Sequence, residues 1–366
     1  MDSKIYLSKP NFKEILINTS FKDNNVLNFE VALEKYLGSN KKIVALNSGT
    51  SAIHLALILA GVQKDDLVIC QSFTFVATAN PILYQRAKPI FIDSEIEKWS
   101  MCPLLLEQTI KKYISLNKKP KAIIVNCNYG MPSKIETIIS IAKFYDIKLI
   151  EDAASGLGAS YKDQKCGTFG DFGIISFNEN KILTTFGGGA LICKSEEDKN
   201  RAIYLASQAK EKFDYYQHSE IGYNYKMDKL SASVGLSELK NIEQYILSRR
   251  KIHLFYVELF QNMEGIHVFH NSDDNYFSNH WLTCILINEK LAGFSNEDMS
   301  NQLLKDNIES RPLWKPMHLQ PVFKGCPFYG DGVSEGLFNS GLCLPSGSNL
   351  TENDLERIST SIKKIL

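Results

Sequence analysis

Short apolar runs alternate with amphipathic stretches through the first half of the chain. The apolar runs predict buried strands at residues 42–46, 66–70, 88–93, 121–126, 147–152 and 172–177. Between them, apolar residues spaced along one helical face predict helices at residues 50–61, 103–114 and 134–145. A further strand, entered through glycine, is expected at residues 187–195. This alternation is typical of a mainly parallel sheet that is covered by helices.

The second part of the chain has a different pattern. Helical spacing dominates from about residue 227 to residue 256, and this stretch is expected to lead into a smaller C-terminal domain. We predict a large domain at residues 1–240, whose N-terminal segment is free to pack on the other domain, and a small domain at residues 241–366. Within the small domain, the pattern predicts a strand and two helices at residues 280–287, 295–307 and 351–366.

Composition and charge narrow the class of protein. The 366 residues are 44% hydrophobic and 22% charged, as in soluble globular proteins. Lysine and arginine number 41, as do aspartate and glutamate, so charge gives no reason to expect a nucleic acid or an anionic membrane as partner. No apolar stretch of the sequence approaches the length of a membrane span, roughly 18 residues. The first residues of the sequence do not resemble a signal peptide. A cytoplasmic protein is therefore expected.

The eight cysteines do not form a metal-binding pattern. None lies in a CxxC pair or has histidines at zinc-finger spacing. Reduced, mostly buried thiols and no metal site are expected. A catalytic cysteine has no supporting motif.

A glycine-containing turn joins the first predicted strand to the first helix. In "NSGTSAIHLAL" (47–57), Gly49 lets the backbone approach an anion, and the helix start offers unpaired N–H groups. The hydroxyls of Ser48, Thr50 and Ser51 add donors, so a phosphate could bind here. An ordinary N-cap with a tight turn is the alternative.

Two acids and one lysine stand where a ligand would be expected. Glu151 and Asp152 end an apolar strand, and open parallel sheets bind ligands beyond the carboxyl ends of their strands. An acid there could instead cap the next helix. Lys181 lies in "SFNENKILTTFGGGA" (176–190), ahead of glycines that leave room for a planar ligand. Lysine is a nucleophile only when it is neutral, so a solvated surface charge is the alternative.

Taken in order, these motifs point to one cofactor. A phosphate-binding turn is followed by the aromatic "SFTF" (72–75), a strand-end aspartate, a lysine and then glycines. Pyridoxal phosphate needs a phosphate cradle, an aromatic face, an acid that pairs with its ring nitrogen and a lysine that bonds to its aldehyde. The acid keeps the ring nitrogen protonated, so that the ring can accept electrons from the substrate carbon.

The ordered set of motifs resembles the DegT-type, fold-type I aminotransferases of nucleotide-sugar biosynthesis. The resemblance runs from "ALNSGTSAIHLAL" through "SFTFVATANPI", "IEDAA", "GTFGDFGIISFNENKILTTFGGGAL" and "GYNYKM" to "RPLWKPMHLQPVF" and "LCLPSGS". It implies an α/β fold, with a mainly parallel seven-stranded-type sheet in the large domain and a smaller α+β C-terminal domain. It also implies L-glutamate as amino donor and a keto-sugar nucleotide as acceptor.

The resemblance assigns roles to particular residues. Lys181 would bond to the cofactor and move the substrate proton, Asp152 would pair with the pyridine nitrogen, and Phe75 would lie against the ring. The phosphate would be held by Gly49, Thr50 and Ser176. Asn224 would reach the phosphate of the neighbouring subunit, which implies a homodimer with shared active sites. The candidates for substrate contact are Asn178, Arg311, Trp314 and His318, although a proline-rich structural turn also explains the last three.

Within the family, "SFNxNKI" together with "RPLWKPMH" is most similar to enzymes that aminate C4 of a UDP-linked 2-acetamido-2,6-dideoxy-4-hexulose. These enzymes serve bacillosamine-type pathways that supply surface glycans. The alternatives are amination of a dTDP- or GDP-linked keto sugar at C3 or C4, and a non-catalytic regulatory relative. Relatives that dehydrate a sugar have histidine in place of Lys181. Two residues depart from the family pattern. Ser155 differs from the residues that the family usually has beside the cofactor ring, and Lys226 replaces the arginine of the family motif "GYNYR".

Overall fold

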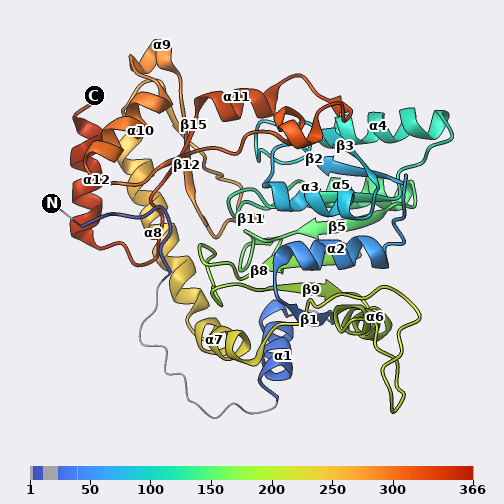
Figure 1. Ribbon diagram of the computed structural model, residues 1–366. Coiled ribbons are helices and arrows are strands. Elements are labelled where there is room, and N and C mark those ends of the chain that lie inside the picture. Colours follow the sequence, from blue (N-terminus) through green and yellow to red (C-terminus); the bar gives the residue numbers. More distant parts are fainter. Residues whose placement is uncertain (1–2, 11–23, 39, 366) are drawn as a thin grey trace.

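The computed structural model describes residues 3–10, 24–38 and 40–365 (Figure 1). Part of the N-terminal stretch in which no signal peptide is predicted therefore lies outside the described residues. Within the described part of the chain, no helix is both long and apolar enough to cross a membrane.

An eight-stranded sheet forms the centre of the molecule, in the order β1-β9-β8-β5-β4-β2-β3-β14. β9 is antiparallel to both of its neighbours, and the remaining pairs are parallel. The predicted mainly parallel sheet is thus confirmed, with one short strand added from the C-terminal part. The strands are β1 (Lys42–Leu46), β2 (Leu67–Gln71), β3 (Lys88–Ile92), β4 (Ala122–Asn126), β5 (Lys148–Asp152), β8 (Phe172–Ser176), β9 (Gly189–Cys193) and β14 (Phe328–Tyr329).

Helices cover both faces of this sheet (Figure 1). Successive side chains of a strand point to opposite faces, so Val68 and Cys70 of β2 pack on one side and Ile69 packs on the other. The first face is covered by α2 (Gly49–Leu59), α3 (Val76–Tyr84) and α6 (Glu196–Ala206). The second is covered by α1 (Asn25–Leu37), α4 (Pro103–Ser115), α5 (Ile135–Phe144) and α7 (Lys229–Leu239). Burial on both faces explains why the strands read as continuous apolar runs.

The long helical stretch predicted at 227–256 is two helices in the structure. α7 ends at Leu239, and α8 (Ile242–Phe260) begins after a break at Lys240 and Asn241. α8 then packs its C-terminal half in the core of the C-terminal part, where Tyr256 and Phe260 are buried. The domain boundary at residue 240 stays a prediction.

The C-terminal part is built on a four-stranded antiparallel sheet in the order β10-β12-β15-β13. Its strands are β10 (Ile266–Val268), β12 (Thr283–Ile287), β13 (Arg311–Pro312) and β15 (Gly341–Leu344). The helices here are α9 (Glu289–Ala292), α10 (Asn296–Lys305), α11 (Val333–Ser340) and α12 (Glu352–Lys363), with short 3-10 turns η1 (Met317–Leu319) and η2 (Pro321–Phe323). A small sheet, β11-β6-β7, pairs β11 (Tyr276–Phe277) with β6 (Ser160–Tyr161), which pairs with β7 (Gln164–Lys165). Ile5 of the N-terminal segment packs in the core between α8 and α12.

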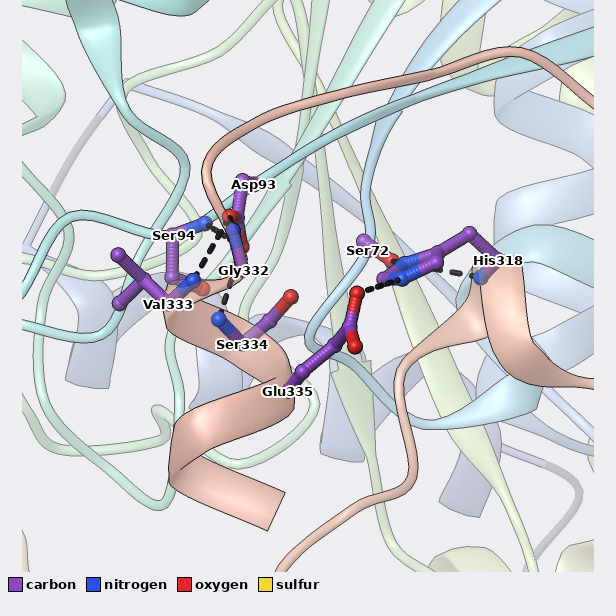
Figure 2. A network of polar contacts seen from close by, with 8 residues as sticks. All are labelled: Ser72, Asp93, Ser94, His318, Gly332, Val333, Ser334 and Glu335. Carbon is purple, nitrogen blue, oxygen red and sulfur yellow. Dashed lines mark hydrogen bonds and ion pairs between the residues drawn. The ribbon is translucent and has the colours of Figure 1, made fainter. Parts of the chain in front are cut away.

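Asp93 fixes α11 to the end of β3 (Figure 2). Its fully buried carboxylate accepts backbone N–H bonds from Gly332, Val333 and Ser334 at 2.8–2.9 Å. It accepts a further one from Ser94 at 2.8 Å. An acid at a helix start satisfies N–H groups that have no partner within the helix.

We expect Asp93→Ala to lower the free energy of unfolding by about 2–3 kcal/mol, because several buried donors lose their acceptor at once. Urea unfolding of the purified protein measures this change. Glu136→Ala is the matched control, because Glu136 forms an exposed ion pair with Lys162 and should cost less than about 1 kcal/mol. Equal losses in the two variants would contradict this account of α11.

Candidate active site

A cavity of about 320 Å³ lies beyond the carboxyl ends of β4, β5 and β8, where α2 and α3 begin. This is the edge at which open parallel sheets bind ligands. The predicted site residues that line it are Gly49, Thr50, Phe75, Asp152, Ser176, Asn178, Lys181 and Trp314. They come from segments up to 265 residues apart in the sequence, between positions 49 and 314. The fold therefore brings most of the predicted site into one place.

The side chain of Lys181 ends inside this cavity. Its Nζ donates to Ser155 Oγ at 3.1 Å and lies 4.0 Å from the ring centroid of Trp281. Burial lowers the pKa of Lys181 to about 8, against the opposing attraction of the Asp152 carboxylate. A lysine in this state is neutral in a sizeable fraction near neutral pH, which is the form that attacks a carbonyl.

Only one of the two strand-end acids faces the cavity, because neighbouring side chains of β5 point to opposite faces. Asp152 accepts a hydrogen bond from Thr78 Oγ1 at 2.6 Å and one from the Ala154 N–H at 3.0 Å. Burial raises the pKa of Asp152, while these donors and Lys181 lower it. A buried carboxylate of this kind gains from a positively charged ligand group beside it.

Glu151 points away from the cavity, and its carboxylate is surrounded by buried groups of the protein. Its carboxylate accepts the Phe169 N–H at 3.0 Å, and burial raises its pKa to about 7. Cys127 and Cys166 place their sulfur atoms near it, all within 4.8 Å of one another. Both thiols are buried: the hydrogen bond with Cys166 and burial raise the pKa of Cys127, while the hydrogen bond with Cys127 opposes the burial that raises the pKa of Cys166. The expected lack of a metal site stays a prediction.

The start of α2 meets the end of β8 at close range. Ser48 caps the helix, with its Oγ accepting the Ser51 N–H at 3.0 Å. A Cβ on Gly49 would lie 3.2 Å from the Cβ of Ser176, and one on Gly189 would lie 2.4 Å from the Gly49 nitrogen. The N-cap and the anion site are therefore compatible here, since capping leaves other N–H groups of the first turn free for a ligand.

Aromatic rings surround the mouth of the cavity. Phe75, at the N-cap position of α3, is 56% exposed, and its ring centroid lies 6.4 Å from that of Trp314. Trp281 is the third aromatic residue that lines the cavity. Its indole N–H donates to the Asn180 carbonyl at 2.8 Å. These rings offer flat apolar faces to a bound ring system.

Two contacts of the site were not predicted from the sequence. Thr78 holds Asp152 from the first turn of α3, and Trp281 covers Lys181 from just before β12. No sequence signal marked Thr78, since α3 was not among the predicted helices; in the structure its hydroxyl bonds to that of Thr74, just ahead of the helix, at 2.7 Å. No local signal marks Trp281, because it precedes a strand that is distant in the sequence.

The structure does not bring Arg311, His318 or Asn224 to the cavity lining. Arg311 is exposed at the edge strand β13 and pairs with Glu309 at 2.9 Å. Asn224 is exposed, and its carbonyl accepts from Asn47 Nδ2 at 3.0 Å. Its predicted contact with a neighbouring subunit stays a prediction.

His318 has its two ring nitrogens engaged elsewhere (Figure 2). Nδ1 lies 2.7 Å from Ser72 Oγ, Nε2 lies 3.1 Å from Glu335 Oε1, and the ring stacks on Phe328 at 3.6 Å between centroids. The side chain therefore ties η1 to the end of β2 and to α11. This placement is compatible with the alternative of a structural turn, and the substrate contact of His318 stays a prediction.

Comparison with known proteins decides the family. The sequence pattern of the DegT/DnrJ/EryC1/StrS aminotransferase family matches residues 9–363. The chain belongs to this aminotransferase family. Its members are pyridoxal phosphate-dependent, so the predicted enzyme class and cofactor are confirmed.

Relatives of this aminotransferase cover nearly its whole length. It is 43% identical over 372 residues to EpsN of Bacillus subtilis, which is named as a pyridoxal phosphate-dependent aminotransferase (98% of this chain, 95% of EpsN). It is 32% identical over 347 residues to the GDP-perosamine synthase of Escherichia coli O157:H7 (94% and 91%). It is also 32% identical over 302 residues to the UDP-4-amino-4,6-dideoxy-N-acetyl-beta-L-altrosamine transaminase of Campylobacter jejuni (81% and 77%).

A solved structure supports the predicted fold class. The DegT DnrJ EryC1 StrS aminotransferase from Brucella abortus matches this aminotransferase with a TM-score of 0.86 at 29% identity. The match covers 93% of this chain and 90% of the other. The fold-type I α/β prediction is thereby confirmed.

Proposed function

We propose that this aminotransferase moves the amino group of L-glutamate to C4 of a UDP-linked 2-acetamido-4-keto-6-deoxy sugar, for a surface polysaccharide or glycan. The observation that carries the proposal is Lys181, a buried amine with a lowered pKa in a cavity that Asp152 also lines. The motif pattern around Lys181 and Trp314 supports the choice of sugar. The similarity to a UDP-sugar transaminase supports the nucleotide. A cytoplasmic location is part of the proposal.

The residues of the cavity fit pyridoxal phosphate. Gly49 and Gly189 let the start of α2 pack closely against β8 and β9. Gly49, Thr50 and Ser176 line the cavity, where the helix start and two hydroxyls can donate to an anion. Within the described part of the chain, the buried Asp152 accepts its hydrogen bonds from the uncharged Thr78 hydroxyl and Ala154 N–H, and a protonated pyridine would add a positive charge beside it. When bound, the cofactor supplies an aldehyde that accepts the amino group and a ring that takes up electrons from the substrate carbon.

The side chains of this protein have separate tasks in that reaction. The Nζ of Lys181 receives the proton that leaves the substrate carbon, and Ser155 and Trp281 hold that nitrogen in place. Asp152 holds its negative charge where the ring nitrogen binds, with Thr78 fixing its carboxylate. Phe75 and Trp314 exclude water from the mouth, and Asn178 offers its amide to the sugar.

We further propose a homodimer with shared active sites, in which the exposed Asn224 meets the phosphate bound in the partner's cavity. Arg311 and His318 are left out of the proposed site, because their side chains make the contacts described above.

The pH dependence of cofactor uptake tests the state of Lys181. The neutral amine attacks the aldehyde, so we expect the rate at which cofactor-free protein takes up pyridoxal phosphate to rise up to a pH of about 8 and then level off. The growth of the visible absorbance band, followed by stopped flow, gives this rate. A rate that keeps rising to a pH of about 10 would indicate an ordinary, solvated lysine.

A second acceptor class is favoured by the similarity to a GDP-perosamine synthase. The test is a panel of UDP-, GDP- and dTDP-linked 4-keto sugars offered with L-glutamate, with mass spectrometry of the products. We expect amination of the UDP-linked 2-acetamido sugar at the highest kcat/KM. Preference for a GDP- or dTDP-linked sugar would replace the proposed substrate, and turnover of none would favour a non-catalytic relative.

A further inference from the structure

Asn279 joins two segments of chain that lie beside the active site. It stands between β11 and β12, and its side chain is fully buried. Its Nδ2 donates to the carbonyls of Ser155 and Leu157 at 3.0 and 2.8 Å, and its Oδ1 accepts the Trp281 N–H at 2.8 Å. Both donor hydrogens and the acceptor oxygen of the amide therefore have partners.

The two ends of this amide bond to the residues that contact the amine of Lys181. Ser155 Oγ accepts a hydrogen bond from Nζ at 3.1 Å, and the Trp281 ring centroid lies 4.0 Å from Nζ. Ser155 is 124 residues from Asn279 in the sequence, whereas Trp281 follows two residues after it. One side chain thus fixes both neighbours of the amine relative to each other.

The backbone is shaped closely around Asn279. Gly130 has a φ of 97°, in the left-handed region, and a Cβ there would overlap Asn279 Oδ1. The Gly130 carbonyl accepts from Ser278 Oγ at 3.0 Å and from the Asn279 N–H at 3.3 Å. His280 has a φ of 46°, which is uncommon for a residue with a side chain and persists where surrounding contacts hold it. These contacts keep residues 278–281 in one conformation.

The contacts that Asn279 fixes keep water from the amine of Lys181. Burial lowers the pKa of Lys181 to about 8. Among the described residues that line the cavity, the other titratable side chains are Asp152, whose charge opposes this shift, and Cys127. The hydrogen bond with Cys166 and burial raise the pKa of Cys127, so that thiol stays neutral. Water admitted to Nζ would favour the charged ammonium.

We propose that Asn279 is a positioning residue, which holds the Ser155 hydroxyl and the Trp281 ring against the amine of Lys181. Asn279 is not among the described residues that line the cavity, so it acts through these two neighbours. Its partners all belong to the same chain, so the arrangement needs no residue of a partner subunit. This inference rests on the proposed role of Lys181 and adds the residue that maintains the surroundings of its amine.

The pH dependence of pyridoxal phosphate uptake by the cofactor-free protein tests this role. The neutral amine attacks the aldehyde, so a higher pKa of Lys181 leaves less reactive amine at pH 7. We expect Asn279→Ala to raise the midpoint of the uptake profile by about 0.5–1 pH unit, which lowers the rate at pH 7 by about 3- to 10-fold. Above a pH of about 10 the two rates should converge, because the amine is then neutral in both proteins.

Asn279→Ser separates the two ends of the amide, and it decides the question if Asn279→Ala does not fold. Ser278 Oγ already accepts the N–H of His280, two residues on, at 3.0 Å. A hydroxyl at position 279 can accept the Trp281 N–H in the same way, but it lacks the two amide hydrogens that the other turn accepts. We expect the midpoint to move in the same direction, and by less than in the alanine variant.

A combined variant tests whether Asn279 acts through its two neighbours. In protein that carries Ser155→Ala and Trp281→Ala, both contacts on the amine are already absent. Adding Asn279→Ala should then change the uptake rate at pH 7 by less than about twofold, because the three substitutions remove one shared effect. A further loss as large as in the wild-type background would contradict the proposal.

Gln71→Ala is the control for stability, because Gln71 makes the same set of bonds and is absent from the described lining of the cavity. Its buried amide donates to the carbonyls of Phe73 and Trp99 at 2.9 and 3.3 Å and accepts the Met101 N–H at 2.8 Å. We expect a loss of stability towards urea similar to that of Asn279→Ala, with the wild-type midpoint of uptake.

The outcomes separate the positioning role from the proposed role of Lys181. An unchanged midpoint in the folded Asn279 variants, or an equal shift in Gln71→Ala, would overturn the positioning role. A wild-type rate that keeps rising to a pH of about 10 would instead overturn the proposed state of Lys181.

Discussion

Lys181→Ala is expected to lower the rate of amino transfer by at least about 10³–10⁴-fold. Alanine removes both the amine that bonds to the cofactor and the base that receives the substrate proton. The neighbouring Ser155 hydroxyl and Trp281 ring cannot replace either function. Steady-state kinetics with glutamate and the preferred keto sugar measure the loss, and the visible band of the holoenzyme should disappear.

Lys181→Arg and Lys162→Ala are the controls for this variant. Arginine keeps the positive charge but stays protonated, so we expect the same loss as with alanine. Lys162 is an exposed lysine paired with Glu136, and its removal should leave kcat unchanged. Substantial activity in Lys181→Ala, or an unchanged absorbance band, would contradict the role of Lys181.

Asp152→Asn is expected to reduce kcat by roughly 10²–10³-fold. The amide has nearly the same size, and its oxygen can still accept the hydrogen bond from Thr78 at the position that the carboxylate now holds. The negative charge is lost, so the ring nitrogen no longer stays protonated and electrons from the substrate carbon are poorly accepted. The kcat of the purified variant, saturated with cofactor, gives the effect.

Glu151→Gln is the matched comparison, because the adjacent acid points to the opposite face of β5 and contacts the Phe169 N–H. We expect this variant to keep the wild-type kcat while it unfolds at a lower urea concentration. Equal losses of kcat in the two variants would show that the assignment of one acid to each face is wrong.

The sheet could be predicted from the sequence because its strands are buried on both faces. A run such as Ala122–Asn126 has no polar interruption, and its bounds in the structure agree with the prediction to within one residue. α3 gave no comparable signal, because it contains Pro81 and its N-cap residue, the bulky Phe75, provides no side-chain cap. Packing against α2 and the sheet stabilises this helix, where local propensity alone would not.

The place of the site could be predicted where chemistry requires one residue type, as for Lys181 and Asp152, which line one cavity while their roles stay predictions. It was less predictable where tertiary packing decides the contact. Trp281 reaches Lys181 because the chain just before β12 lies beside the active-site cavity, and no local pattern contains that information. His318 shares a motif with Trp314, yet its ring turns toward Ser72 and Glu335 rather than into the cavity.

The covalent link to the cofactor is the most direct test of the account. Borohydride reduction of the holoenzyme converts the carbon–nitrogen double bond to a stable single bond, and peptide mass spectrometry then locates the attached pyridoxyl group. The account predicts that the added mass lies on the peptide containing Lys181 and is absent from Lys181→Ala. A pyridoxyl group on another lysine, or on none, would contradict it.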